Sequence, residues 1–191
     1  EMVRALSKSE FVVYYQPKYE LTNDTIIGAE ALVRWNHKEK GIISPGVFIP
    51  VFERNGFIVD LDFYVYEQVL KMQKHRLDMG KKVIPISMNV SRCHLSDTNF
   101  VDKLEAVVAK YKVPKQYIEM EITESIFSQE DSSAIALIYN LKEHGFTISM
   151  DDFGSGYSSL NLLRKVQIDT LKIDKVFIDS TEDVQRSQVI V

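Results

Sequence analysis

The stretch Glu119-Met120-Glu121-Ile122-Thr123 decides the fold, because it places an acidic residue at every second position of an apolar run. Successive side chains of a β-strand point to opposite faces, so Glu119 and Glu121 share one face while Met120 and Ile122 share the other. The same alternation recurs in residues 28–35, 86–90, 149–151 and 171–174. The sequence therefore predicts a sheet whose one face is polar toward the downstream ends of its strands.

Working outward from this stretch, apolar runs alternate with amphipathic segments. Strands are predicted at residues 11–16, 26–35, 83–90, 117–123, 147–150 and 170–177, and helices at 61–79, 99–111 and 131–144. This alternation favours an α/β domain with a largely parallel sheet, and the short link at 22–24 favours an antiparallel opening pair. Segment 36–59 is irregular, which is typical of a functional loop or of a loop with short helices.

Composition narrows the class of protein. With 191 residues, 45% hydrophobic and 26% charged, the chain is not of disordered composition. Its 23 basic and 27 acidic residues give a net charge of −4, which offers no general attraction to a nucleic-acid polymer or an anionic membrane. The lone Cys93 cannot form an intrachain disulfide, and neither a signal pattern nor a membrane-length apolar run is present. We expect one cytoplasmic domain, or the cytosolic part of a membrane-anchored protein.

The polar strand ends carry an excess of acid. Four carboxylates and one amide lie there: Glu30, Glu121, Asp151, Asp152 and Asn89. Burying several carboxylates costs several kcal/mol each, and we count only Arg34 and Lys172 as counter-charges. An all-oxygen ligand set suits Mg²⁺ or Mn²⁺, and zinc is disfavoured because no strand-end His or Cys competes. The sequence leaves open whether His37 and His94, which follow strands, line the same cleft.

Several motifs carry a resemblance to a known family. Residues 30–35 (EALVRW), 89–91 (NVS), 121–125 (EITES), 151–160 (DDFGSGYSSL) and 171–174 (LKID), with 15–17 (YQP) and 44–46 (SPG), resemble in order and spacing the EAL family of cyclic-di-GMP phosphodiesterases. The resemblance covers residues 11–178, almost the whole chain. It implies a TIM-like (β/α) barrel whose first strand is antiparallel.

The resemblance also implies a role for each matching residue. Ligands of one Mg²⁺ or Mn²⁺ would be Glu30, Asn89, Glu121 and Asp151. Asp152 would bind a second ion, with Asp151 bridging the two, and Lys172 would hold the nucleophilic water. Gln16 and Arg34 would lie near the bound dinucleotide, and Glu124 would steady the loop after Asp152. In the family that loop couples metal binding to dimerisation, so a homodimer is expected.

The implied function is hydrolysis of cyclic di-GMP to linear pGpG with two metal ions. A second hypothesis is a catalytically inactive EAL domain that binds cyclic di-GMP as a receptor; a generic phosphoester hydrolase is the third. The family's later Glu-Gly-Val-Glu and Gln-Gly motifs do not follow residue 178. We therefore expect residues 1–191 to be a single EAL domain truncated at its C-terminal end, within a protein that carries further regulatory domains.

Overall fold

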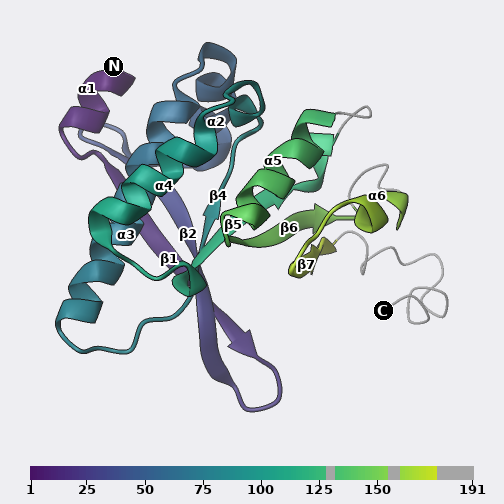
Figure 1. Cartoon of the computed structure of the whole chain (residues 1–191). Helices are drawn as coiled ribbons and strands as arrows, with labels where there is room; N and C mark the ends of the chain where they lie inside the picture. Colours follow the sequence, from purple (N-terminus) through teal and green to yellow (C-terminus); the bar gives the residue numbers. More distant parts are fainter. Residues whose placement is uncertain (128–131, 155–159, 176–191) are drawn as a thin grey trace.

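The computed structural model describes residues 1–127, 132–154 and 160–175 and contains one curved sheet (Figure 1). Its strands are hydrogen-bonded in the order β1 (Phe11–Glu20), β2 (Thr25–His37), β4 (Ile86–Asn89), β5 (Ile118–Thr123), β6 (Thr147–Phe153) and β7 (Thr170–Ile173). Strand β1 is antiparallel to β2, and every later neighbour in this order is parallel. The predicted α/β class with an antiparallel opening pair is confirmed.

The three predicted helices are present as α3 (Ile58–Asp78), α4 (Phe100–Tyr111) and α5 (Ser132–Glu143). Segment 36–59 contains a short strand, β3 (Gly41–Ile43), which pairs with β2, and helix α2 (Pro45–Asn55). Helix α2 begins with proline in its first turn, where no N–H is needed, and ends at Gly56 with φ of 78°. Of the two alternatives for this segment, the one with short helices is therefore confirmed.

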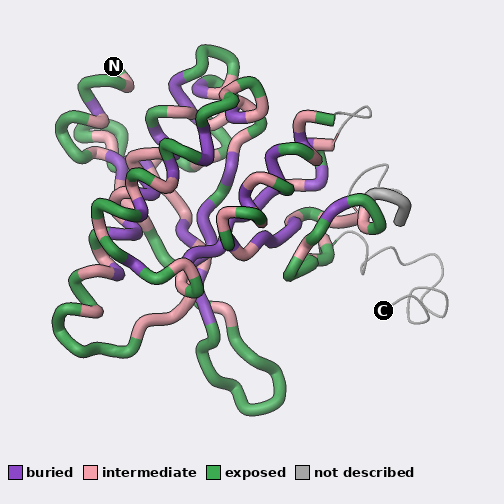
Figure 2. The backbone as a smooth tube through the Cα atoms, in the orientation of Figure 1, coloured by how far each residue is buried: buried purple, intermediate pink, exposed green. Residues whose placement is uncertain are grey.

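The structure also contains helices that the sequence did not predict, and two strand regions differ from the prediction in length. Helix α1 (Met2–Ser7) precedes β1, whereas helix α6 (Leu160–Lys165) and three 3-10 helices, Arg92–Ser96, Lys115–Tyr117 and Glu124–Phe127, were not assigned from sequence. The strand predicted over 83–90 is limited to Ile86–Asn89, whereas the opening hairpin is longer than predicted and its tip is exposed (Figure 2). Residues 176–177 of the last predicted strand lie outside the described residues. No described helix combines the length and apolarity needed to cross a bilayer.

The main apolar core lies between one face of the sheet and helices α3, α4 and α5. Met88, Met120 and Met150, on three adjacent strands, have no exposed surface there. A second cluster of aromatic residues fills the space between β1, β2 and α2, where Phe11 contacts Phe52 with ring centroids 6.0 Å apart. These two cores support the sheet from outside and leave its inner face for polar residues.

Candidate metal centre

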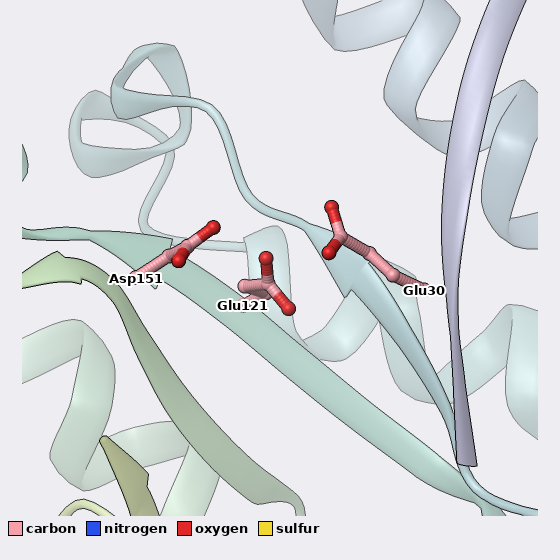
Figure 3. Close-up of side chains that lie close together, drawn as sticks. All are labelled: Glu30, Glu121 and Asp151. Carbon is pink, nitrogen blue, oxygen red and sulfur yellow. The ribbon is translucent and has the colours of Figure 1, made fainter. Parts of the chain in front are cut away.

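Three carboxylates from different strands meet on the inner face of the curved sheet (Figure 3). Glu30 lies on β2, Glu121 on β5 and Asp151 on β6, and one oxygen of each lies within 4.8 Å of the others. Strand alternation directs these side chains inward while their chain neighbours enter the apolar core. The sequence prediction that acids from separate strand ends would lie together is met for these three residues.

Lys172 on β7 lies among the three carboxylates. Its ammonium donates hydrogen bonds to Glu30 Oε2 at 2.9 Å, Glu121 Oε1 at 2.6 Å and Asp151 Oδ2 at 2.9 Å. Burial opposes the charge of Lys172, but these three hydrogen bonds outweigh it and raise the pKa above its ordinary value. The oxygens therefore already surround one cation, which is the arrangement that a divalent ion would require.

The most buried of the acids, Glu121, is only 1% exposed. Burial raises its pKa to about 7, and Asp151 and Glu30 add to this shift, while Lys172 opposes it. Glu121 Oε2 has no hydrogen-bond partner among the residues that the structure describes. A buried acceptor without a donor, in an all-oxygen set, fits a site for a hard divalent cation.

A bulge in β6 places two consecutive aspartates at this centre. The pairing with β7 shifts between Met150 and Phe153, and Asp152 has φ of 57°, which asparagine and aspartate tolerate better than most residues. The Asp152 backbone N–H donates to Asp151 Oδ1 at 2.9 Å. Burial and the neighbouring Asp151 raise the pKa of the Asp152 carboxyl. Asp152 is thus close to the three clustered acids without belonging to their group.

Glu124 lies directly after β5 and is 7% exposed. Its Oε2 accepts a hydrogen bond from the Gly154 backbone N–H at 2.8 Å. This contact ties the end of β5 to the segment that follows Asp152. Residues 155–159, on which the expected dimer contact falls, lie outside the described residues.

Two of the three remaining predicted site residues line a cavity of about 330 Å³. Asn89 and Arg34 line this cavity together with Glu30. Asn89 is aligned with Glu121 in the β4–β5 pairing, and the Arg34 guanidinium lies 5.9 Å from the Tyr14 ring centroid. Gln16 is exposed and faces Glu30 in the β1–β2 register, but it is not among the residues that line the cavity.

The sequence analysis did not identify one cation near the candidate metal centre. Lys18 on β1 forms ion pairs with Glu119 at 3.0 Å and with Glu121 Oε2 at 3.8 Å. Counting only Arg34 and Lys172 as counter-charges was therefore wrong. The signal was available, because Lys18 lies two positions after Gln16 and so on the same face of the strand.

The sequence left open whether His94 lines the cleft, and the structure shows that its side chain is buried away from the cavity. Its Nε2 lies 2.9 Å from Asp62 Oδ2, and its ring packs against Phe100 with centroids 4.2 Å apart. Asp62 lines the cavity, whereas His94 does not. The Ser91 backbone N–H also donates to Asp62, at 3.3 Å. This buried pair therefore anchors the segment that follows Asn89.

The fold is of the α/β class, with a largely parallel sheet that opens with an antiparallel pair and carries an acidic cluster on its inner face. Comparison with known proteins identifies the family. The profile of the EAL domain matches residues 1–191, so the chain belongs to the EAL domain family. The expected TIM-like barrel class is confirmed with it.

Curated relatives cover almost all of the chain. It is 33% identical over 179 residues to the bifunctional diguanylate cyclase/cyclic di-GMP phosphodiesterase MucR of Pseudomonas aeruginosa, covering 94% of this chain and 26% of MucR. It is 33% identical over 192 residues to the signaling protein YkoW of Bacillus subtilis, covering 100% of this chain and 24% of YkoW. The chain thus spans about a quarter of the length of these relatives.

Solved structures share the fold. The phosphodiesterase of MucR in complex with c-di-GMP superimposes with a TM-score of 0.88 at 32% identity, covering 99% of this chain and 76% of that one. The EAL enzyme Bd1971 in its cAMP- and cyclic-di-GMP-bound form gives 0.86 at 32% identity, covering 99% and 52%. Both similarities extend over nearly all of the present chain.

Proposed function

We propose that the chain is the catalytic part of a metal-dependent phosphodiesterase that hydrolyses cyclic di-GMP to linear pGpG. The observation that carries the proposal is the convergence of Glu30, Glu121 and Asp151 on a single cation, the Lys172 ammonium. Their oxygen atoms match the ligand preference of Mg²⁺ or Mn²⁺. The known activity of MucR supports the choice of substrate.

The proposed metal site uses the clustered acids and their neighbours. Glu30, Glu121, Asp151 and Asn89 would hold one Mg²⁺ or Mn²⁺, and Asp152 would hold the second. When bound, the two ions activate a water and neutralise charge on the phosphate oxygens. Because Asp151 and Asp152 are consecutive across the bulge, both can serve neighbouring ions.

Other side chains act on the substrate and on its surroundings. Lys172 holds its proton at Nζ, within hydrogen-bond reach of three carboxylates, and favours an anionic nucleophile beside it. Arg34 offers a guanidinium to a phosphate at the cavity, and Gln16 contacts the dinucleotide from β1. Glu124 fixes Gly154 and thereby the loop after Asp152.

The decisive experiment is a turnover assay. Purified full-length protein, stripped of metal and then given Mn²⁺ or Mg²⁺, is incubated with cyclic di-GMP, and the products are separated by chromatography. We expect pGpG to form only when the metal is present. Tight binding of cyclic di-GMP without turnover would instead support the receptor hypothesis, and neither binding nor turnover would favour a different phosphoester.

The wider organisation is also a proposal. We propose that residues 1–191 form part of one EAL domain in a longer cytoplasmic or membrane-anchored signalling protein, because MucR and YkoW are several times longer. A homodimer through the loop after Asp152 completes this proposal. Sedimentation of the full-length protein with and without Mn²⁺ tests the dimer.

A further inference from the structure

We propose that Lys18 is a positioning residue that fixes the carboxylate of Glu121 from beneath the metal centre. This inference rests on the metal site of the proposed function and deepens it. Lys172 holds Glu121 Oε1 at 2.6 Å, whereas the Lys18 ammonium lies 3.8 Å from Oε2, the other oxygen of the same carboxylate. Glu121 is therefore flanked by two ammonium groups from opposite ends of the sheet, β1 and β7.

Lys18 belongs to a second polar layer inside the curved sheet. Its ammonium donates hydrogen bonds to Ser87 Oγ and to Glu119 Oε1, the latter at 3.0 Å. Ser87 and Glu119 each lie two residues before a predicted metal ligand on the same strand, Asn89 and Glu121. Strand alternation therefore places this layer directly under the metal centre.

The Lys18 side chain passes beside a glycine on the neighbouring strand. Gly28 is paired with Lys18 in the β1–β2 register and lies two residues before Glu30 on the same face of β2. A Cβ at this glycine would lie 3.8 Å from Lys18 Cδ and 3.1 Å from Pro85 O. A larger side chain at position 28 would occupy the space beside the Lys18 stem. Gly28 thus allows β2 to approach Pro85 closely, next to the Lys18 stem that extends toward Glu119 and Glu121.

Two observations show why Glu121 needs this support. The Glu121 side chain has no solvent-exposed surface, so water cannot orient it. Its Oε2 has no hydrogen-bond partner in the described part of the chain, and Lys18 is the cation that faces this atom. At 3.8 Å in a poorly solvated interior, an ammonium acts on a carboxylate mainly through its charge. Lys18 therefore sets which way Glu121 points while Glu119 holds Lys18 in place.

A simpler alternative is that Lys18 serves only to neutralise Glu119. Both roles predict that Lys18→Met lowers the stability of the protein, because Glu119 is left buried without its partner. They differ for the double variant Lys18→Met/Glu119→Gln, which removes the orphaned charge but restores no cation beside Glu121. The double variant is thus the matched control for charge compensation.

The test measures Mn²⁺ affinity directly. Free Mn²⁺ is followed by electron paramagnetic resonance in titrations of the full-length protein and its variants. Loss of a group that orients a metal ligand typically weakens binding about 10- to 100-fold. We expect this loss in Lys18→Met and, with thermal stability restored, in the double variant, and we expect Lys18→Arg to recover part of the affinity.

Wild-type affinity in the double variant would overturn the inference, as would tighter or unchanged Mn²⁺ binding in Lys18→Met. Circular dichroism melting of each variant separates loss of folding from loss of metal. Should the wild-type protein bind Mn²⁺ without hydrolysing cyclic di-GMP, the proposed function fails while the titration still decides the role of Lys18.

Discussion

Neighbouring side chains at the centre of strand β5 are equally buried on its two faces and have opposite roles. On the outer face Met120 and Ile122 are 0% and 1% exposed and pack under the helices. On the inner face Glu121 is 1% exposed and lies between two lysines. The exposed fraction of a side chain therefore does not indicate whether it stabilises the fold or belongs to the site. The groups that the side chain contacts do. The outer face stabilises the fold, whereas the inner face holds paired charges at the proposed metal site.

The largest expected effect is on turnover, from removing a ligand on the inner face. Glu30→Ala deletes one of the three clustered carboxylates, so we expect cyclic di-GMP hydrolysis to fall to background while the far-ultraviolet circular dichroism spectrum is unchanged. Glu39→Ala, at an exposed turn position, is the control and should retain full activity. Metal-dependent activity in Glu30→Ala would contradict its assignment as a ligand.

The outer face should respond through stability instead. Met120→Ala removes a fully buried side chain, and such changes cost about 2–5 kcal/mol in free energy of unfolding. Urea unfolding measures the loss, and Mn²⁺ titration of the remaining folded protein should give an unchanged affinity. A fall in metal affinity without a fall in stability would break the division between the two faces.

We expect an intermediate effect on turnover from a change at Glu124, which follows β5 and contacts the segment after β6. Glu124→Ala leaves the Gly154 N–H without its acceptor, which costs about 1–3 kcal/mol when the group is buried. We expect faster amide exchange at Gly154 and roughly 10-fold slower turnover, on the scale of supporting contacts in metal sites. Glu124→Gln keeps an acceptor oxygen and serves as the matched variant. Equal effects of the two changes would show that charge, rather than the hydrogen bond, matters.

The smallest effect separates the two proposed ions. Asp152→Asn retains a residue type that tolerates positive φ, so the backbone of the bulge is kept. Calorimetric titration with Mn²⁺ should show weaker binding of the second ion and nearly unchanged binding of the first. Equal weakening of both would remove the distinction between Asp151 and Asp152.

The residues that face the apolar core could be predicted from sequence, because side chains alternate between the two faces of a strand. Glu30, Glu121 and Asp151 could also be placed together, since the carboxyl ends of parallel strands meet at one edge. The strand pattern places Lys18 on the inner face with Gln16, but its pairing with Glu119 and Glu121 on β5 depends on strand order and register, which one sequence does not reveal. The burial of His94 depends on packing against Phe100, which no local pattern encodes.

The bulge in β6 shifts by one residue the alternation of side chains between the two faces of the sheet. Ser149 and Asp151 face the interior of the curve, yet Phe153, also two positions further on, packs against the outer apolar core. Asn at position 152 tolerates the same positive φ and should keep this reversal, whereas we expect removal of one residue there to direct the Phe153 ring toward the acidic centre. The length of this segment therefore decides which side chains reach the acidic centre, in addition to the chemistry of Asp151 and Asp152.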